Sequence, residues 1–335
     1  MIGIGVIGYG YWGPNLVRNF AEAPGATVFG ISDMRSERLA EAGRRYPAAR
    51  TMESYPDLLA DPKIDAIAIA TPVSTHFKLA MEALNAGKHV LLEKPLASSS
   101  LQAIELIEEA ARRNLVLMVD HTFVYTGAVR KIRELVTTAA LGDIYYYDAV
   151  RVNLGLFQHD VNVIWDLAVH DLAILDFVLA DKPVAVSATG VSHISGQPEN
   201  IAYITLFFAE SRIAHLHVNW LAPVKVRRTL IGGSERMIVY DDLEPSEKVK
   251  VYDKGVALSP AREQVYELLV SYRTGDMWAP KLDQTEGLQT EARHFLDCIQ
   301  NDKRPETDGL AGLRVVRLLE AAEKSMRARG ELVEL

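Results

Sequence analysis

A glycine-spaced turn near the start of the chain restricts its possible folds more than any other feature. Gly8, Gly10 and Gly13 follow an apolar run over residues 2–7 and open a stretch with helical spacing over residues 12–22. At this spacing the first glycine makes a tight turn, the second lets a pyrophosphate approach the backbone, and the third lets helix and strand pack closely. The N–H groups at the helix start then face the phosphates. The turn therefore predicts a βαβ unit that binds a dinucleotide, with contacts from Gly8, Tyr9, Gly10, Tyr11, Trp12 and Gly13.

Apolar runs and helical patterns alternate over the first 120 residues. The runs are short and apolar on both faces, as in strands buried inside a parallel sheet. They lie at residues 2–7, 27–31, 66–70, 89–92 and 116–119. Helical patterns fill the intervals at residues 12–22, 36–45, 75–86 and 98–114. The alternation predicts a doubly wound α/β Rossmann domain with a parallel sheet over residues 1–120.

The pattern changes after residue 120. Helical patterns cover residues 125–138 and 161–179, and strand-like segments then follow one another without helices between them. These segments lie at residues 184–189, 202–208, 212–220, 227–231 and 237–240. Successive strands of this kind form antiparallel sheets. We therefore expect residues 121–335 to form an α+β domain with a large, mostly antiparallel open sheet. The sequence leaves open whether the closing helices at 286–301 and 309–329 pack back on the first domain.

Composition excludes several classes of protein. The chain has 36 lysines and arginines against 44 aspartates and glutamates, a net charge of −8 that does not suit a general nucleic-acid binder. No apolar run reaches the roughly 18 residues of a membrane-spanning helix, and the first residues lack the basic segment and cleavage site of a signal peptide. The single cysteine, Cys298, rules out an intramolecular disulfide and a multi-cysteine metal site. We expect a cytoplasmic protein that binds neither nucleic acid nor membrane.

An acidic residue marks the end of the second predicted strand. Asp33 follows Gly13 by about 20 residues, where a carboxylate accepts hydrogen bonds from the adenosine ribose and repels a 2′-phosphate. Arg35 weakens this preference, because its guanidinium can pair with that phosphate. The two residues predict NAD as the cofactor, with NADP as the less favoured alternative.

The strand at 89–92 is followed by Glu93-Lys94-Pro95. In open α/β sheets, ligands bind outside the carboxyl ends of the strands, so Lys94 is expected to face the cofactor crevice. Pro95 lacks a backbone donor and keeps Lys94 out of a helical conformation, which defines the turn.

The strand at 66–70 ends in a similar way, in Thr71-Pro72. His76 lies on the first turn of the helix that follows. A histidine there either contacts the cofactor or packs at the start of a helix, and the sequence leaves both alternatives open.

These segments together resemble the Gfo/Idh/MocA oxidoreductases. The resemblance rests on the glycine turn, on Thr71-Pro72 with His76, and above all on the block AGKHVLLEKP at residues 86–95. It runs from residue 2 to about residue 325 and implies an NAD(P)-dependent oxidoreductase acting on CH–OH groups. It also implies a second domain that binds the substrate and packs its sheet against another subunit, giving a homodimer or homotetramer. The cofactor contacts that it implies are Thr71, Pro72, His76, Glu93 and Lys94.

The family carries a D-x-x-x-H segment in its second domain, and here Asp166 and His170 match it. A spacing of four places both side chains on one helix face. The pair suits a histidine acting as acid or base beside a carboxylate that orients it. The alternative is a buried, hydrogen-bonded histidine beside a surface aspartate. Two potential ligands without a third do not predict a metal site, and Asp171, on another face, is interpreted as structural.

Other segments resemble the nucleotide-sugar branch of the family. They are residues 151–155 (RVNLG), 160–166 (DVNVIWD) and 278–282 (WAPKL). Arg151 and Asn153 share a strand face, where they would bind a carboxylate or phosphate and a hydroxyl; the alternative is an ordinary surface pair. Lys281 and His121 are further candidates for substrate contact. The segment DHTF at 120–123 stands where many members carry an asparagine-arginine loop, so the usual arginine contact is in doubt.

The resemblance implies reversible hydride transfer between nicotinamide and a sugar carbon, most specifically C3 of a nucleotide-linked sugar such as UDP-N-acetylglucosaminuronate. His170, polarised by Asp166, is the first choice as base, with Lys94 stabilising negative charge on the substrate oxygen. The roles can be reversed, because a buried lysine with a depressed pKa acts as a base. Alternative functions are a dehydrogenase of free polyols such as inositol, a 3-ketosugar reductase, and a non-catalytic NAD-binding regulator.

Overall fold

The computed structural model describes residues 1–155, 161–253, 255–258 and 270–335. The chain forms two compact units, each built from separate stretches of sequence. The first contains Met1–Thr126 and Gln284–Glu320, and the second contains Gly127–Asp283 and Ala321–Leu335.

A parallel sheet of six strands forms the centre of the first unit. Its spatial order is β3-β2-β1-β4-β5-β6, and every neighbouring pair is parallel. The strands are β1 (Ile2–Ile7), β2 (Ala26–Ser32), β3 (Arg50–Met52), β4 (Ala66–Ile69), β5 (His89–Glu93) and β6 (Leu117–Asp120). The predicted Rossmann sheet is confirmed. The sequence pattern missed β3, because this edge strand is only three residues long and carries two exposed side chains.

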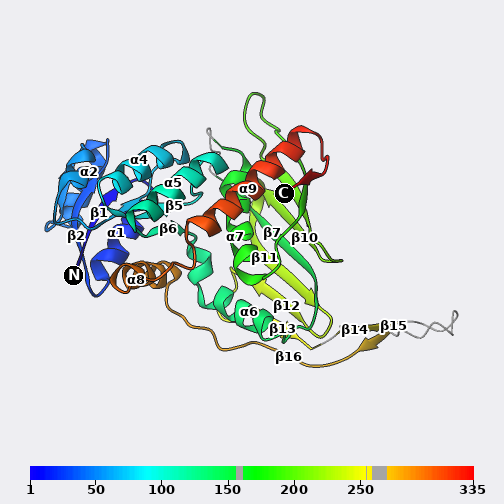
Figure 1. Cartoon of the computed structure of the whole chain (residues 1–335). Coiled ribbons are helices and arrows are strands. Elements are labelled where there is room, and N and C mark those ends of the chain that lie inside the picture. Colours follow the sequence, from blue (N-terminus) through cyan, green and yellow to red (C-terminus); the bar gives the residue numbers. More distant parts are fainter. Residues whose placement is uncertain (156–160, 254, 259–269) are drawn as a thin grey trace. The chain divides into compact units, whose positions relative to one another are not determined.

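Helices cover both faces of this sheet. They are α1 (Gly13–Glu22), α2 (Ser36–Arg45), α3 (Pro56–Ala60), α4 (Val73–Asn85), α5 (Ser100–Arg113), η1 (Thr122–Tyr125), α8 (Gly287–Gln300) and the first part of α9 (Gly309–Arg327). Helices α4 and α5 pack side by side, and α1 packs with α8 on the other side of the strands (Figure 1). The second contact includes the rings of Phe20 and Phe295, which meet edge-on at 6.1 Å. Helix α8, which lies far along the chain, thus belongs to the first unit.

The second unit contains a nine-stranded sheet in the order β16-β13-β12-β11-β7-β10-β9-β8-β17. Its strands are β7 (Ile144–Leu154), β8 (Ala185–Val191), β9 (Ile201–Phe207), β10 (Ile213–Asn219), β11 (Leu221–Gly233), β12 (Met237–Asp241), β13 (Val249–Tyr252), β16 (Met277–Trp278) and β17 (Val333–Glu334). A separate hairpin pairs β14 (Gly255–Leu258) with β15 (Val270–Arg273). The predicted open, mostly antiparallel sheet is confirmed.

One pair in this sheet departs from the antiparallel pattern. Strands β7 and β10 run parallel. Parallel neighbours need a crossover connection, and here it contains helices between residues 164 and 178 and the strands β8 and β9. The sequence prediction of successive antiparallel strands could not include this pair, because its two strands are separated along the chain.

Two predicted helices are divided in the structure. The segment predicted as one helix at 125–138 contains the end of η1 and then α6 (Gly127–Thr137), because Thr126 between them is extended. The segment predicted at 161–179 contains a π-helical turn, η2 (Ile164–Ala168), followed by α7 (Val169–Val178). Helix α7 packs on β7 (Figure 1). Most of its side chains are buried. Across the described residues, no helix has both the length and the apolar character required to cross a bilayer.

Candidate functional site

The three glycines of the turn after β1 differ in the space around them. Gly8 has a φ of 95°, and a Cβ there would lie 2.3 Å from the Ala70 carbonyl oxygen. A Cβ on Gly13 would lie 2.0 Å from the Gly8 carbonyl oxygen, so both positions require glycine. A Cβ on Gly10 would meet only the tip of Arg35, at 3.2 Å. Helix α1 begins without a side-chain cap. The turn therefore fits a pyrophosphate group, which would approach at Gly10 and the helix start.

Asp33 holds one side of this turn. Its carboxylate, which is buried, accepts a hydrogen bond from the Tyr9 backbone N–H at 2.7 Å and from the Arg35 backbone N–H at 2.9 Å. The Arg35 side chain adds contacts at 3.0 and 3.2 Å. Burial opposes ionisation of Asp33, but the hydrogen bonds from Arg35 and Tyr9 outweigh it and lower the pKa of the carboxyl. Asp33 is therefore an anion directly after β2, and its contact with a ribose stays a prediction.

Asp120 holds the other side of the turn. It ends β6, and its Oδ2 accepts a hydrogen bond from the Trp12 indole Nε1 at 2.6 Å. The sequence predicts that Trp12 contacts the cofactor and assigns Asp120 no role beyond a departure from the family pattern. The signal that was available is the position of Asp120 at the carboxyl end of a buried parallel strand.

His76 connects two strand-end turns. Its ring is fully buried, with Nδ1 2.8 Å from the Pro95 carbonyl oxygen and Nε2 2.9 Å from the Thr71 carbonyl oxygen. Of the two sequence-based alternatives, these contacts favour the packed helix start. Direct contact of His76, Thr71 or Pro72 with cofactor stays a prediction.

Lys94 lies directly after β5 and is half-buried. Its backbone N–H donates to Oε2 of Glu93 at 2.7 Å, and the Lys94–Pro95 peptide bond is cis. His121, which follows β6, is buried. The predicted site residues of the first unit therefore gather at the carboxyl ends of β1, β2, β4, β5 and β6, the edge at which open α/β sheets bind ligands.

The second unit presents Asp166 and His170. Asp166 lies in the π-helical turn and His170 in the first turn of α7, and both are partly exposed among buried neighbours. Oδ2 of Asp166 accepts a hydrogen bond from the indole Nε1 of Trp220 at 3.0 Å. Trp220 is almost fully buried and is a partner that sequence reasoning missed, because it lies 54 residues away along the chain.

Arg151 is buried rather than placed at a surface. Its Nε and Nη2 contact the two carboxylate oxygens of Asp171 at 2.8 and 2.9 Å. Burial works to lower the pKa of Arg151, but Asp171 outweighs it and raises the pKa. Asp171 thus has the structural role expected of it, whereas substrate contact by Arg151 stays a prediction. Asn153 is half-buried near the end of β7 and Lys281 is exposed; Asp160 lies outside the described residues.

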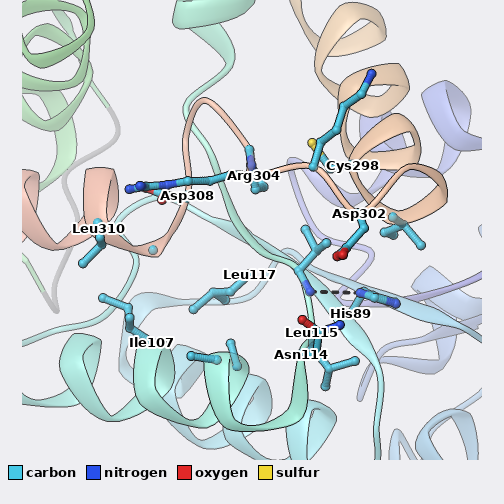
Figure 2. A pocket seen from close by; sticks show the side chains of 17 residues that line it. His89, Ile107, Asn114, Leu115, Leu117, Cys298, Asp302, Arg304, Asp308 and Leu310 are labelled. Atoms are coloured by element: carbon cyan, nitrogen blue, oxygen red, sulfur yellow. Dashed lines mark hydrogen bonds and ion pairs between the residues drawn. The ribbon is translucent and has the colours of Figure 1, made fainter.

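A cavity of about 370 Å³ opens at the other edge of the parallel sheet (Figure 2). It lies at the amino-terminal ends of β5 and β6, where the Val116 N–H donates to Nδ1 of His89 at 2.9 Å. Leu117, Cys298 and Arg304 also line it. Its position separates it from the glycine turn and Lys94. Within the ranges that the structure covers, no group of three or more His, Cys, Asp or Glu side chains could hold a metal ion.

The glycine turn, the anion at Asp33 and the strand-end turns define a dinucleotide-binding α/β protein. The chain belongs to the Gfo/Idh/MocA family and is an oxidoreductase of that family. Residues 2–121 match the model described as "Oxidoreductase family, NAD-binding Rossmann fold", and residues 129–239 match the "GFO/IDH/MocA C-terminal domain". The resemblance stated from the sequence motifs is confirmed.

Characterised relatives match over nearly the whole chain. UDP-N-acetylglucosamine 3-dehydrogenase of Acidithiobacillus ferrooxidans is 30% identical over 316 residues, which cover 93% of each chain. A solved structure of that enzyme matches with a TM-score of 0.82 at 28% identity and covers 98% of each chain. Myo-inositol 2-dehydrogenase of Thermotoga maritima is 23% identical over 97% of this chain and 96% of its own.

Two glycine substitutions should affect NAD affinity and protein stability separately. Gly10→Ala adds a methyl group where only the flexible tip of Arg35 lies near, so we expect near wild-type thermal stability but NAD affinity reduced at least about tenfold. Gly13→Ala drives a Cβ into the Gly8 carbonyl and should destabilise the first unit by about 1–3 kcal/mol or more. Thermal unfolding and calorimetric NAD titration measure both effects. Unchanged NAD affinity in Gly10→Ala would contradict the assignment of the turn.

Proposed function

We propose that the protein transfers hydride between a nicotinamide dinucleotide and C3 of a nucleotide-linked sugar, with a UDP-linked N-acetylated sugar as the leading candidate. The observation that carries this proposal is the match to UDP-N-acetylglucosamine 3-dehydrogenase over 93% of both chains. It is supported by the glycine turn with Asp33 in the first unit and by the partly exposed pair of Asp166 and His170 in the second.

The protein groups have distinct proposed roles. The bound nicotinamide supplies the hydride acceptor or donor. The ammonium of Lys94 binds the substrate oxygen and stabilises negative charge that develops on it. His170 takes the hydroxyl proton during oxidation and returns it during reduction. Asp166, held by the Trp220 indole, orients His170. The reversed assignment, with Lys94 as the base, is the alternative.

Substrate contacts are assigned to His121, Arg151, Asn153 and Lys281. Lys281 is exposed and cationic, which suits a nucleotide phosphate or a uronate. Asn153 offers an amide for a sugar hydroxyl. Arg151 already uses two nitrogens on Asp171, so it contributes through Nη1 or by fixing the strand that carries Asn153.

A second candidate function is dehydrogenation of a free polyol, which the similarity to myo-inositol 2-dehydrogenase favours. The 3-ketosugar reductase is the same chemistry in the opposite direction. A non-catalytic regulator is disfavoured, because the chain retains Lys94, Asp166 and His170 together.

Substitution of the proposed catalytic groups tests the reaction. Formation of NADH, followed at 340 nm, should occur with UDP-N-acetylglucosamine or UDP-N-acetylglucosaminuronate and not with myo-inositol. Lys94→Ala and His170→Asn should each lower turnover by roughly 10²–10⁴, because each removes a group that acts on the reacting oxygen. Lys78→Ala, on the exposed face of α4, and His193→Asn, in an exposed loop, serve as matched controls and should retain activity. Near wild-type turnover in either test variant would remove that residue from the mechanism.

Oxidation of myo-inositol but not of the UDP-linked sugars would instead establish that the protein is a dehydrogenase of free polyols. If neither substrate is oxidised, consumption of NADH with a dTDP-linked 3-ketosugar tests the reductive direction.

The cofactor is proposed to be NAD rather than NADP. The Asp33 carboxylate would accept hydrogen bonds from the ribose hydroxyls, and its negative charge opposes a 2′-phosphate. Arg35 is half-exposed and holds Asp33 in the structure, so it is also the group that a 2′-phosphate would recruit.

Replacement of the carboxylate should therefore change the preference. In Asp33→Ser the ratio of kcat/KM for NAD to that for NADP should fall about a hundredfold, since hydrogen bonds to the ribose are lost and charge repulsion disappears. In Asp33→Ser combined with Arg35→Ala, the gain with NADP should be smaller, because its cation is absent. Steady-state kinetics with both cofactors measure these ratios. An unchanged ratio in Asp33→Ser would contradict the proposal.

We further propose that the large sheet packs its outer face against a second copy of the chain, giving a dimer or tetramer. Along β9 and β10, alternate residues face the core and the outer face. On the outer face Tyr203, Phe207 and Ile213 are between 36% and 44% exposed. The ring of Tyr203 stacks on His217 at 4.5 Å and faces His215 at 6.1 Å. An apolar and aromatic surface of this kind is unusual on a monomer.

A charge placed on this face should prevent association. We expect Ile213→Glu to lower the molar mass, measured by light scattering after size exclusion, to that of a smaller species. Leu101→Glu replaces an equally apolar residue that is 72% exposed on α5, and should leave the mass unchanged. Identical masses for Ile213→Glu and the wild type would contradict the assigned interface.

A further inference from the structure

Helix α8 carries a carboxyl group that is completely enclosed. Glu291 has no exposed surface, both of its oxygens are shielded from solvent, and among the described residues no N–H or O–H group donates a hydrogen bond to either of them. Their polar neighbours are the carboxyl group of Asp120 at the end of β6 and the hydroxyl of Thr122 in η1. A buried carboxyl placed against another carboxyl costs free energy unless a proton lies between them.

Asp120 is the acceptor of this pair. Its Oδ2 receives the Trp12 indole N–H at 2.6 Å, and its Oδ1 receives the Thr122 hydroxyl. Both oxygens of Asp120 thus already accept hydrogen bonds, whereas those of Glu291 accept none among the described residues. A proton on Glu291 would link the two carboxyl groups, with Glu291 as donor and Asp120 as acceptor. Burial raises the pKa of Glu291 well above its ordinary value, and the charges of Asp120 and Glu93 raise it further.

The charged surroundings of Glu291 are mostly acidic. On β5, Glu93 stands opposite Asp120 in the strand register. Tyr125 of η1 is buried nearby, and its phenol has a raised pKa because of burial and the proximity of Glu291. From α1, the cation Arg18 pairs with Glu286, immediately before α8, at 2.6 Å. Loss of the Glu291 proton would thus add a negative charge beside Asp120 and Glu93.

We propose that Glu291 is a positioning residue: as a neutral acid it donates a hydrogen bond to Asp120, and thereby keeps Trp12 and the glycine turn in the conformation that binds the dinucleotide. The chain of contacts runs from α8 through the end of β6 to Trp12, the N-cap residue of α1. This inference rests on the proposed cofactor site.

The affinity for the dinucleotide should depend on pH. When Glu291 loses its proton, two carboxylates face each other, and Asp120 can no longer hold Trp12 in the same place. Affinity for the dinucleotide should therefore fall as the pH rises. In Glu291→Gln an uncharged amide N–H replaces the acid proton and cannot be lost.

The experiment compares NAD affinity across the neutral and alkaline range in wild type, Glu291→Gln and Asp297→Asn. Asp297 lies on the same helix but on its exposed face, paired with Lys303 at 2.9 Å, so its variant is the matched control. Wild type and Asp297→Asn should lose affinity on the order of tenfold per pH unit once Glu291 ionises. Glu291→Gln should bind NAD like the wild type at neutral pH and keep that affinity in alkali. Superimposable profiles for wild type and Glu291→Gln would overturn the inference.

Unfolding without cofactor provides the second readout. A group whose pKa is raised on folding stabilises the protein fully below its unfolded pKa, and this stabilisation is lost as the pH rises through the folded pKa. Between the unfolded and the folded pKa of Glu291, the folding equilibrium constant of wild type should therefore fall relative to that of Glu291→Gln, by up to about tenfold per pH unit. If this difference appears while the NAD profiles coincide, Glu291 is merely structural and the positioning role is wrong. If no variant binds NAD at any pH, the proposed cofactor site fails, and this inference fails with it.

Discussion

The conformation of the turn between β1 and α1 is the constraint on which the rest of the first unit depends. Two carboxylates hold it, Asp33 through the Tyr9 backbone and Asp120 through the Trp12 indole. Asp33 directly follows β2, and Asp120 is the last residue of β6. All strands of a parallel sheet direct their carboxyl ends to one edge, so residues distant in sequence reach the same turn. The order β3-β2-β1-β4-β5-β6 therefore decides which residues can support it.

Buried polar groups link the other loops of that edge. His76 spans the turns after β4 and β5 through the carbonyls of Thr71 and Pro95, and Glu291 faces Asp120 from α8. A polar group without partners is costly inside a protein, so each of these side chains restricts where the neighbouring loop can lie. Such restriction keeps the edge in one geometry before a ligand arrives, which favours binding.

The second unit uses the same device on a different scaffold. The buried pair of Arg151 and Asp171 joins β7 to α7, and Trp220 joins the end of β10 to Asp166. Removing either partner of a buried ion pair leaves an uncompensated charge, so β7 and α7 are held in one register. Helix α7 then presents His170 while most of its other side chains are buried.

Local patterns were enough to predict the Rossmann strands, the glycine turn, Asp33 and the family, because apolar periodicity and glycine spacing act over a few residues. They also indicated Asp166 and His170 as a pair, but not the π-helical turn that carries Asp166. The sequence left open whether the closing helices pack back on the first domain, and the folded chain places α8 there. The parallel pairing of β7 with β10 and the contacts of Asp120 with Trp12 and of Asp166 with Trp220 emerge only in the folded chain. Each joins residues tens to hundreds of positions apart, and their proximity is set by packing and strand order rather than by local sequence.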